Sequence, residues 1–133
     1  MRSNGIVIHT DGACKGNPGP GGWGAVIEQN GGQVKLSGSE PQTTNNRMEM
    51  TAVIKGLEAV DALANVLISS DSTYVINTMT KGWKRKANQD LWDQLDRLVQ
   101  SRNVSWRWVR GHNGDRGNEL ADALATKEAG TAK

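Results

Sequence analysis

The sequence contains a single cysteine, Cys14, and no apolar run long enough to span a membrane. A lone cysteine excludes an intramolecular disulfide and a zinc site built from several thiolates. The first ten residues, MRSNGIVIHT, lack the basic and then apolar pattern of a secretory leader. We therefore expect a soluble, cytoplasmic protein.

Repeats, biased segments and a strong excess of one charge are also missing. Sixteen Lys and Arg residues against 14 Asp and Glu residues give a net charge of +2, so a nucleic-acid partner would need a local basic patch. The length of 133 residues favours one domain, 1–133, with a core over about 5–128 and a short flexible C-terminal tail. We expect a monomer.

The one basic run is KGWKRK, residues 81–86, which carries the aromatic residue Trp83. Charge runs are most often solvated faces of a protein. The alternative is a nucleic-acid contact, in which Trp83 packs on a sugar or a base and Arg107, Arg110 and Arg116 add phosphate contacts. The remaining tryptophans are expected in the core or at its rim.

Hydrophobic periodicity predicts an α/β fold. Alternating patterns predict strands at 5–11, 22–28, 33–39 and 104–109, and a short apolar run predicts one at 66–70; helical patterns predict helices from Asn45, at 72–79, from Asn88 and around 120–125. This order predicts a five-stranded mixed sheet, with three antiparallel strands plus two parallel strands, flanked by helices.

Four carboxylates stand in otherwise unacidic motifs: Asp11, Glu49, Asp71 and Asp122. Chain direction places Asp11, Glu49 and Asp71, together with His112, at the carboxyl edge of the parallel strands, where open α/β sheets bind ligands. Asp122 stands among apolar residues of the last helix. It would face inward only if another group compensated its charge.

Each acid also has an ordinary structural interpretation. Asp11 followed by Gly12 is typical of a turn, Glu49 of a first helical turn, and Asp71 with Ser72 of a helix N-cap. Convergence favours a metal site, because two carboxylates about 4 Å apart repel by roughly 4 kcal/mol at an effective dielectric near 20. Oxygen ligands select Mg²⁺ or Mn²⁺, and we predict two ions.

Short polar residues surround the same edge: Cys14, Asn17, Thr44, Asn45 and Asn46. Turn formation and helix capping are their ordinary roles, and phosphate or sugar binding is the alternative. His112 lies in the glycine-rich loop GHNGDRG. It is either a solvated loop residue or a group that assists proton transfer or product release.

Five motifs occur in a fixed order: TDGACKGNPGPGGWGAV, TTNNRMEM, SDSTYV, WVRGH and GNELADALA. Together they closely resemble bacterial ribonuclease HI from residue 5 to about residue 128. The resemblance implies a ribonuclease H-like fold and endonucleolytic cleavage of the RNA strand of an RNA/DNA hybrid, with 5′-phosphate and 3′-hydroxyl ends.

The resemblance also implies roles for individual residues. Asp11 matches a ligand shared by two metals, Glu49 and Asp71 match ligands of the leaving-group ion, Asp122 matches a ligand of the water-activating ion, and His112 matches the catalytic-loop histidine. Positions that contact the RNA strand are matched by Gly12, Asn17, Asn45 and Asn46. Cys14 matches a position near the minor groove of the hybrid, and Thr44 matches one that binds a DNA phosphate. Glu119 matches an acid linked to product release.

Three features depart from the family pattern. Thr73 replaces a substrate-contacting glutamine, Gln42 replaces an arginine of the phosphate pocket, and the segment between Tyr74 and Leu91 lacks a long basic handle. These departures imply weaker, more salt-sensitive hybrid binding. Two alternatives stay open: an inactive hybrid-binding module, and a resolvase- or transposase-like nuclease that cuts DNA.

Overall fold

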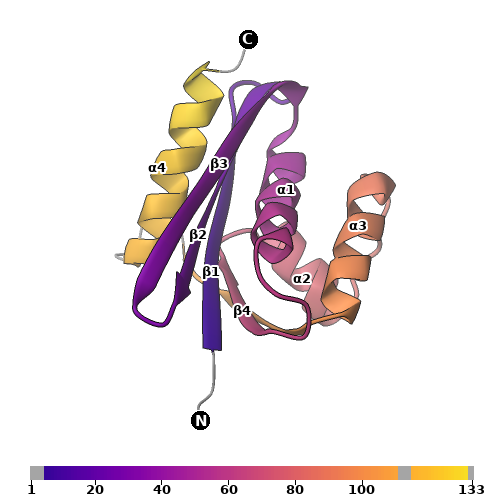
Figure 1. Cartoon of the computed structure of the whole chain (residues 1–133). Helices are drawn as coiled ribbons and strands as arrows, with labels where there is room; N and C mark the ends of the chain where they lie inside the picture. The colour runs from indigo at the N-terminus through magenta and orange to yellow at the C-terminus, as the bar shows by residue number, and fades with distance from the viewer. Residues whose placement is uncertain (1–4, 111–114, 132–133) are drawn as a thin grey trace.

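The computed structural model describes residues 5–110 and 115–131 (Figure 1). Its elements, in chain order, are β1 (Gly5–Cys14), β2 (Gly19–Gln29), β3 (Gly32–Thr43), α1 (Asn45–Glu58), β4 (Asn65–Ser70), α2 (Thr73–Lys81), α3 (Gln89–Gln100), β5 (Asn103–Trp108) and α4 (Arg116–Thr131). Every strand and helix predicted from periodicity is present. None of the helices in these ranges is long and apolar enough to cross a membrane.

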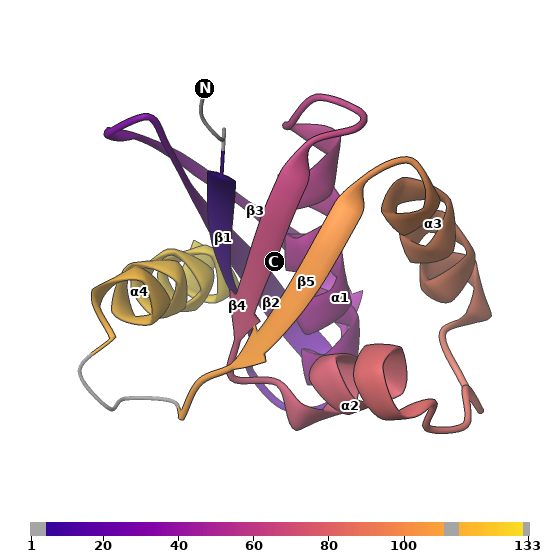
Figure 2. The same ribbon diagram turned by 90° about the horizontal axis from the view of Figure 1, so that it is seen from below.

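The strands form one mixed sheet in the order β3-β2-β1-β4-β5. β1 pairs antiparallel with β2, as β2 does with β3, whereas β4 runs parallel to β1 and β5 parallel to β4. Figure 2 shows α4 on one face of the sheet and α1, α2 and α3 on the other. The predicted α/β architecture is therefore confirmed.

The first three strands are longer than predicted, because glycine-rich segments that read as turns continue the ladder. Asp11 lies within β1, where it pairs with Gly24 of β2. The parallel pairing of β1 with β4 stops one residue earlier, at Thr10 and Ser70. Asp11 thus lies where β1 loses its parallel neighbour.

The main core lies between the sheet and α1. The apolar stripe predicted for this helix is buried: Met50, Val53, Ile54, Leu57 and Val60. Ile8 and Ile68 face it from the sheet, and Trp92 of α3 closes the layer at 1% exposure. Since burial of each such side chain contributes about 1.5–3 kcal/mol, this layer fixes the position of α1.

Helix α4 packs unusually close to β2 because both surfaces carry small residues. A Cβ atom on Gly24 would lie 2.5 Å from the carbonyl oxygen of Ala121, and one on Gly22 would lie 2.5 Å from that of Ala125. The helix continues to Thr131, beyond the core end expected at 128, and Ala129 is buried. Close packing brings the second turn of α4 down to β1.

Candidate metal-binding active site

Three of the four acids converge where β1 and β4 separate. Asp11 projects from β1, Asp71 directly follows β4, and Glu49 projects from α1. One carboxylate oxygen from each residue lies within 4.8 Å of the other two. This edge is the carboxyl end of the parallel strands, so the structure brings together the residues that chain direction placed there.

Turn formation and helix capping, the ordinary roles considered for these acids, do not apply in the structure. Asp11 is a strand residue and not part of a turn. Thr44 caps α1, whose first turn holds no acid, so Glu49 neither caps that helix nor sits at its start. Ser72 caps α2 by accepting a hydrogen bond from the Val75 amide at 3.1 Å. The carboxylates of Asp11, Glu49 and Asp71 have no capping function to explain them.

Gly12 allows Glu49 to reach the cluster. A Cβ atom at residue 12 would collide with the backbone nitrogen of Glu49 and would lie 2.6 Å from the carbonyl carbon of Met48. The Gly12 amide also donates to Asp11 Oδ1 at 2.9 Å. The contact of β1 with α1 thus requires a residue without a side chain, which is a structural reason for Gly12 apart from any RNA contact.

Asp122 reaches the cluster from the opposite face of the sheet. It is half-buried on α4, and its carboxyl group lies close enough to Asp11 to raise the pKa of that acid. It is not one of the three acids whose oxygens lie within 4.8 Å of one another. The preceding residue, Ala121, is fully buried against Gly24. The close packing of α4 is therefore what lets a short aspartate contact β1.

Burial and repulsion hold protons on this cluster. Desolvation, the charge of Asp71 and the hydrogen bond with Asp122 raise the pKa of Asp11 to about 8. Desolvation and the charges of Asp11 and Asp71 raise the pKa of Glu49. Both acids lose water that stabilises their charged forms, and each faces like charges.

The donor set fits a hard divalent cation. Over residues 5–110 and 115–131, none of the four acids forms an ion pair with Lys, Arg or His. Glu49 Oε1 is buried and finds no hydrogen-bond partner in the same ranges. An unpaired buried carboxylate oxygen is costly unless a cation or proton meets it, and oxygen ligands suit Mg²⁺ or Mn²⁺.

Comparison with known proteins identifies the family. The ribonuclease H family model matches residues 3–130. The chain is 50% identical over 142 aligned residues to ribonuclease H of Maricaulis maris, covering 96% of this chain and 95% of the relative. It is 52% identical over 137 aligned residues to ribonuclease H of Polaromonas naphthalenivorans, and the alignment covers 92% of this chain and 85% of that relative. The chain belongs to the ribonuclease H family, which is a family of nucleases.

Solved structures of the family share this fold. One of them is LC11-RNase H1 in complex with an RNA/DNA hybrid, which superposes with a TM-score of 0.80 at 26% identity. The alignment covers 95% of this chain and 97% of that one. The ribonuclease H fold expected from the motifs is confirmed.

Other residues expected to bind substrate lie around the start of α1. The Asn17 side chain accepts a hydrogen bond from the Asn45 amide at 2.9 Å, and Thr44 accepts one from the Arg47 amide at 3.2 Å. The side chains of Asn45 and Asn46 are exposed. Thr44 and Asn17 thus have a structural role whether or not they also contact substrate, and the two exposed asparagines face solvent at the start of the helix that carries Glu49.

Cys14 and Glu119, two further residues expected to serve the site, lie on different elements. The Cys14 thiol lies 3.4 Å from the Thr43 carbonyl and 3.5 Å from that of Gly19, across the ends of β1, β2 and β3. Glu119 is exposed in the first turn of α4. His112 lies outside the described residues.

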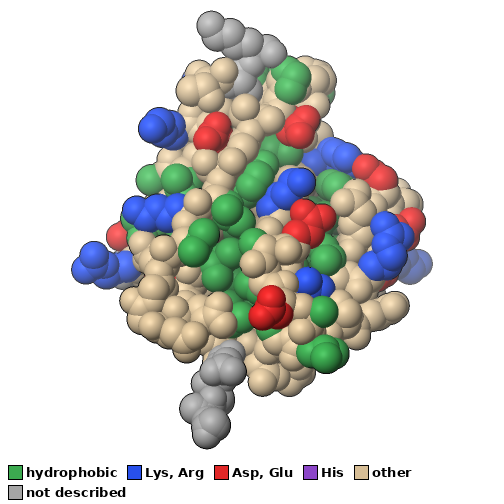
Figure 3. Space-filling model, viewed as in Figure 1, with side chains coloured by type: hydrophobic (Ala, Val, Ile, Leu, Met, Phe, Trp, Pro, Cys, Tyr) green, Lys and Arg blue, Asp and Glu red, His purple; other side chains and the backbone are tan. Residues whose placement is uncertain are grey.

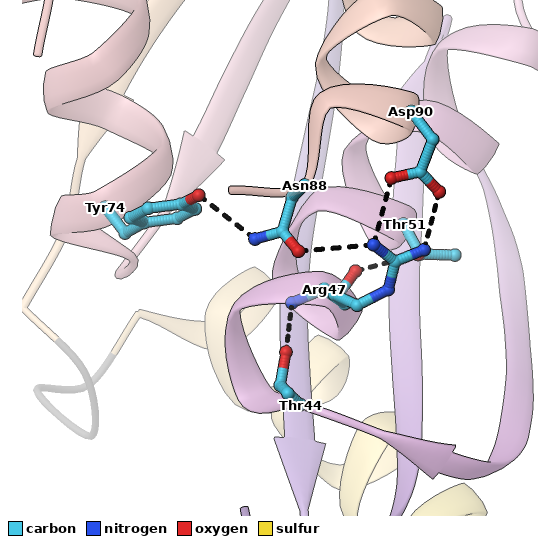
Figure 4. A network of polar contacts seen from close by, with 6 residues as sticks. All are labelled: Thr44, Arg47, Thr51, Tyr74, Asn88 and Asp90. Atoms are coloured by element: carbon cyan, nitrogen blue, oxygen red, sulfur yellow. Dashed lines mark hydrogen bonds and ion pairs between the residues drawn. The ribbon is translucent and has the colours of Figure 1, made fainter. Parts of the chain in front are cut away.

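Arg47 was not singled out by the sequence, yet it connects three helices (Figure 4). Its guanidinium donates to both carboxylate oxygens of Asp90, at 3.0 and 2.7 Å, and to Asn88 Oδ1 at 3.2 Å. Asn88 in turn donates to the Tyr74 hydroxyl at 3.1 Å. Nothing in the motif TTNNRMEM reveals these partners, because they come from α2 and the start of α3.

The basic run divides into two parts. Lys81, Trp83, Lys84 and Lys86 are exposed, with Trp83 at 48%. Arg85 instead bonds Asp96 at 2.6 Å and lies 4.9 Å from the centre of the Trp92 ring. Arg85 is therefore engaged within the protein, whereas the four exposed residues are those of the run that are free of such contacts among the described residues. Acidic and basic side chains are interspersed on the face in Figure 3.

Proposed function

We propose that this chain is an endonuclease that hydrolyses the RNA strand of RNA/DNA hybrids and leaves 5′-phosphate and 3′-hydroxyl ends. The observation that carries the proposal is the convergence of Asp11, Glu49 and Asp71, whose carboxylate oxygens lie within 4.8 Å of one another. Membership of the ribonuclease H family and the hybrid bound to LC11-RNase H1 support the substrate class.

Asp11, Glu49, Asp71 and Asp122 would hold two Mg²⁺ ions with substrate bound, and Mn²⁺ would substitute. When bound, such ions supply charge neutralisation at the scissile phosphate and activation of water. The raised pKa values of Asp11 and Glu49 mean that these acids release protons when a cation binds. Binding of a cation by these four acids would therefore displace the protons that Asp11 and Glu49 hold in its absence.

The surrounding residues orient the RNA strand in this proposal. Gly12, Asn17, Asn45 and Asn46 contact its sugars and bases, and Cys14 lies near the minor groove. Thr44 contacts a DNA phosphate, and Trp83 packs on a sugar or a base. His112 assists proton transfer or product release, and Glu119 contributes to release. The exposure of Asn45, Asn46 and Trp83 supports contact with a macromolecule.

A cleavage assay tests the proposal. Wild type and Asp11→Asn are incubated under one Mg²⁺ condition with a hybrid, a DNA duplex and an RNA duplex, and the product ends are analysed. Cleavage confined to the RNA strand of the hybrid, abolished in Asp11→Asn, is expected. Cleavage of the DNA duplex would instead indicate a resolvase-like nuclease, and hybrid binding without cleavage an inactive module.

We also propose that residues 1–133 form one domain and act as a cytoplasmic monomer. Sedimentation equilibrium measures the oligomeric state directly. A mass twice that of the chain would contradict the monomer.

A further inference from the structure

Trp108 is a large apolar side chain that the proposed site does not explain. It is the last residue of β5, and 46% of its surface is exposed. Its strand neighbour Ser70 immediately precedes Asp71. An exposed indole therefore stands beside one of the clustered carboxylates.

Three hydrogen bonds hold this part of β5 rigidly against the end of β4. The Trp108 indole N–H donates to the Asp71 carbonyl at 3.2 Å, and the Val109 amide donates to the Ser70 carbonyl at 2.9 Å. Arg107 adds a bond to the Ser69 hydroxyl at 3.3 Å. The carboxyl ends of β4 and β5 lie side by side in Figure 2.

The exposed part of Trp108 is apolar, and basic residues precede and follow it in the chain. Its only polar atom already has a partner in the Asp71 carbonyl, so the ring surface is what remains for a ligand. Arg107 and Arg110 are both exposed. Arg107 precedes Trp108 in the strand and bonds Ser69 on the other face of the sheet, so Arg110 is the nearer candidate for a phosphate contact. An exposed aromatic ring near a cation binds nucleic-acid strands through packing and phosphate attraction, without base-specific hydrogen bonds.

We propose that Trp108 contacts the substrate, with its indole ring packed on a sugar or base of the strand that enters the carboxylate cluster. The N–H bond to Asp71 sets the ring orientation before substrate arrives. This inference rests on the proposed function. It adds a sequence-independent contact on β5 to the contacts proposed for the asparagines of α1.

Steady-state kinetics on the hybrid with Trp108→Ala and Trp108→Phe test the contact. Loss of the ring in Trp108→Ala is expected to raise KM about tenfold, since a stacked base contributes on that scale. Trp108→Phe retains a ring and is expected to recover most of that affinity. Leu63→Ala, at an exposed apolar residue at the opposite end of β4, is the matched control and leaves KM unchanged.

A fluorescence titration separates contact from a structural effect. Asp11→Asn with Trp83→Phe removes cleavage and the other strongly exposed tryptophan, and a labelled hybrid reports binding independently by anisotropy. Hybrid is expected to change the tryptophan emission, and adding Trp108→Phe is expected to abolish that change. Binding with the same emission change in both variants, or equal KM in all Trp108 variants, would overturn the contact. Absence of both binding and cleavage would overturn the proposed function instead.

Discussion

Replacing Asp11 with asparagine should stabilise the metal-free protein while it abolishes cleavage. The change keeps the shape of the side chain but removes its charge from a buried group of acids. Burial, Asp71 and Asp122 raise the pKa of Asp11 from 3.8 to about 8. At neutral pH the folded protein therefore holds a proton on this residue that the unfolded chain releases.

The size of the effect follows from that shift. Each pH unit above 3.8 costs the folded state about 1.4 kcal/mol until the pH nears 8, which makes about 4 kcal/mol at pH 7. We expect Asp11→Asn to gain roughly 1–4 kcal/mol in unfolding free energy. The gain is at the lower value if the proton in wild type is shared among Asp11, Glu49 and Asp122, so that removing one acid relieves only part of the cost. Because the folded pKa is the higher one, the advantage of the variant grows as the pH rises through this window.

Urea denaturation in EDTA at about pH 5 and about pH 8 measures the advantage. Saturating Mg²⁺ should reverse it, since the cation binds the folded wild type preferentially. Asp93→Asn, at an exposed carboxylate of α3, is the control and should show no such pH dependence. An Asp11→Asn protein no more stable than wild type near pH 7, or equally favoured at both pH values, would refute the argument.

Three further predictions concern the carboxylate cluster and the helix that carries Glu49. Gly12→Ala should abolish cleavage and lower the unfolding free energy by several kcal/mol in urea denaturation, because its Cβ collides with the Glu49 backbone; wild-type activity would contradict this contact. Arg47→Lys keeps the charge but loses the bidentate pair with Asp90, which ties the start of α1 to α3. Because Asn45 and Asn46 lie at that helix start, kinetics should show a larger rise in KM than fall in kcat, and an unchanged KM would mean that the pair does not position them. Calorimetry should find Mg²⁺ affinity rising up to about pH 8 as Asp11 loses its proton; a pH-independent affinity would argue against Asp11 as a ligand.

The sequence alone determined the elements, their order and the edge that carries the acids. The stripe from Met50 to Val60 predicted α1, and the crossover rule oriented β4 and β5 parallel to β1. Periodicity reports which face of an element is apolar. Chain direction then placed Asp11 and Asp71 at neighbouring strand ends, and this needs no knowledge of side-chain contacts.

Only the tertiary structure decided how those acids meet and which nearby residues are occupied elsewhere. Gly24 allows α4 to pack closely enough on β2 for Asp122 to come near Asp11. Arg85 packs on Trp92, and Trp108 remains exposed beside Asp71. Each outcome depends on side-chain neighbours that the local sequence pattern does not name. A local pattern of residues reports its own period and charge but not the neighbour that packing brings against it. Here that neighbour decides whether a glycine belongs to a turn or allows a close helix contact. It also decides whether a basic or aromatic side chain is free to bind a ligand.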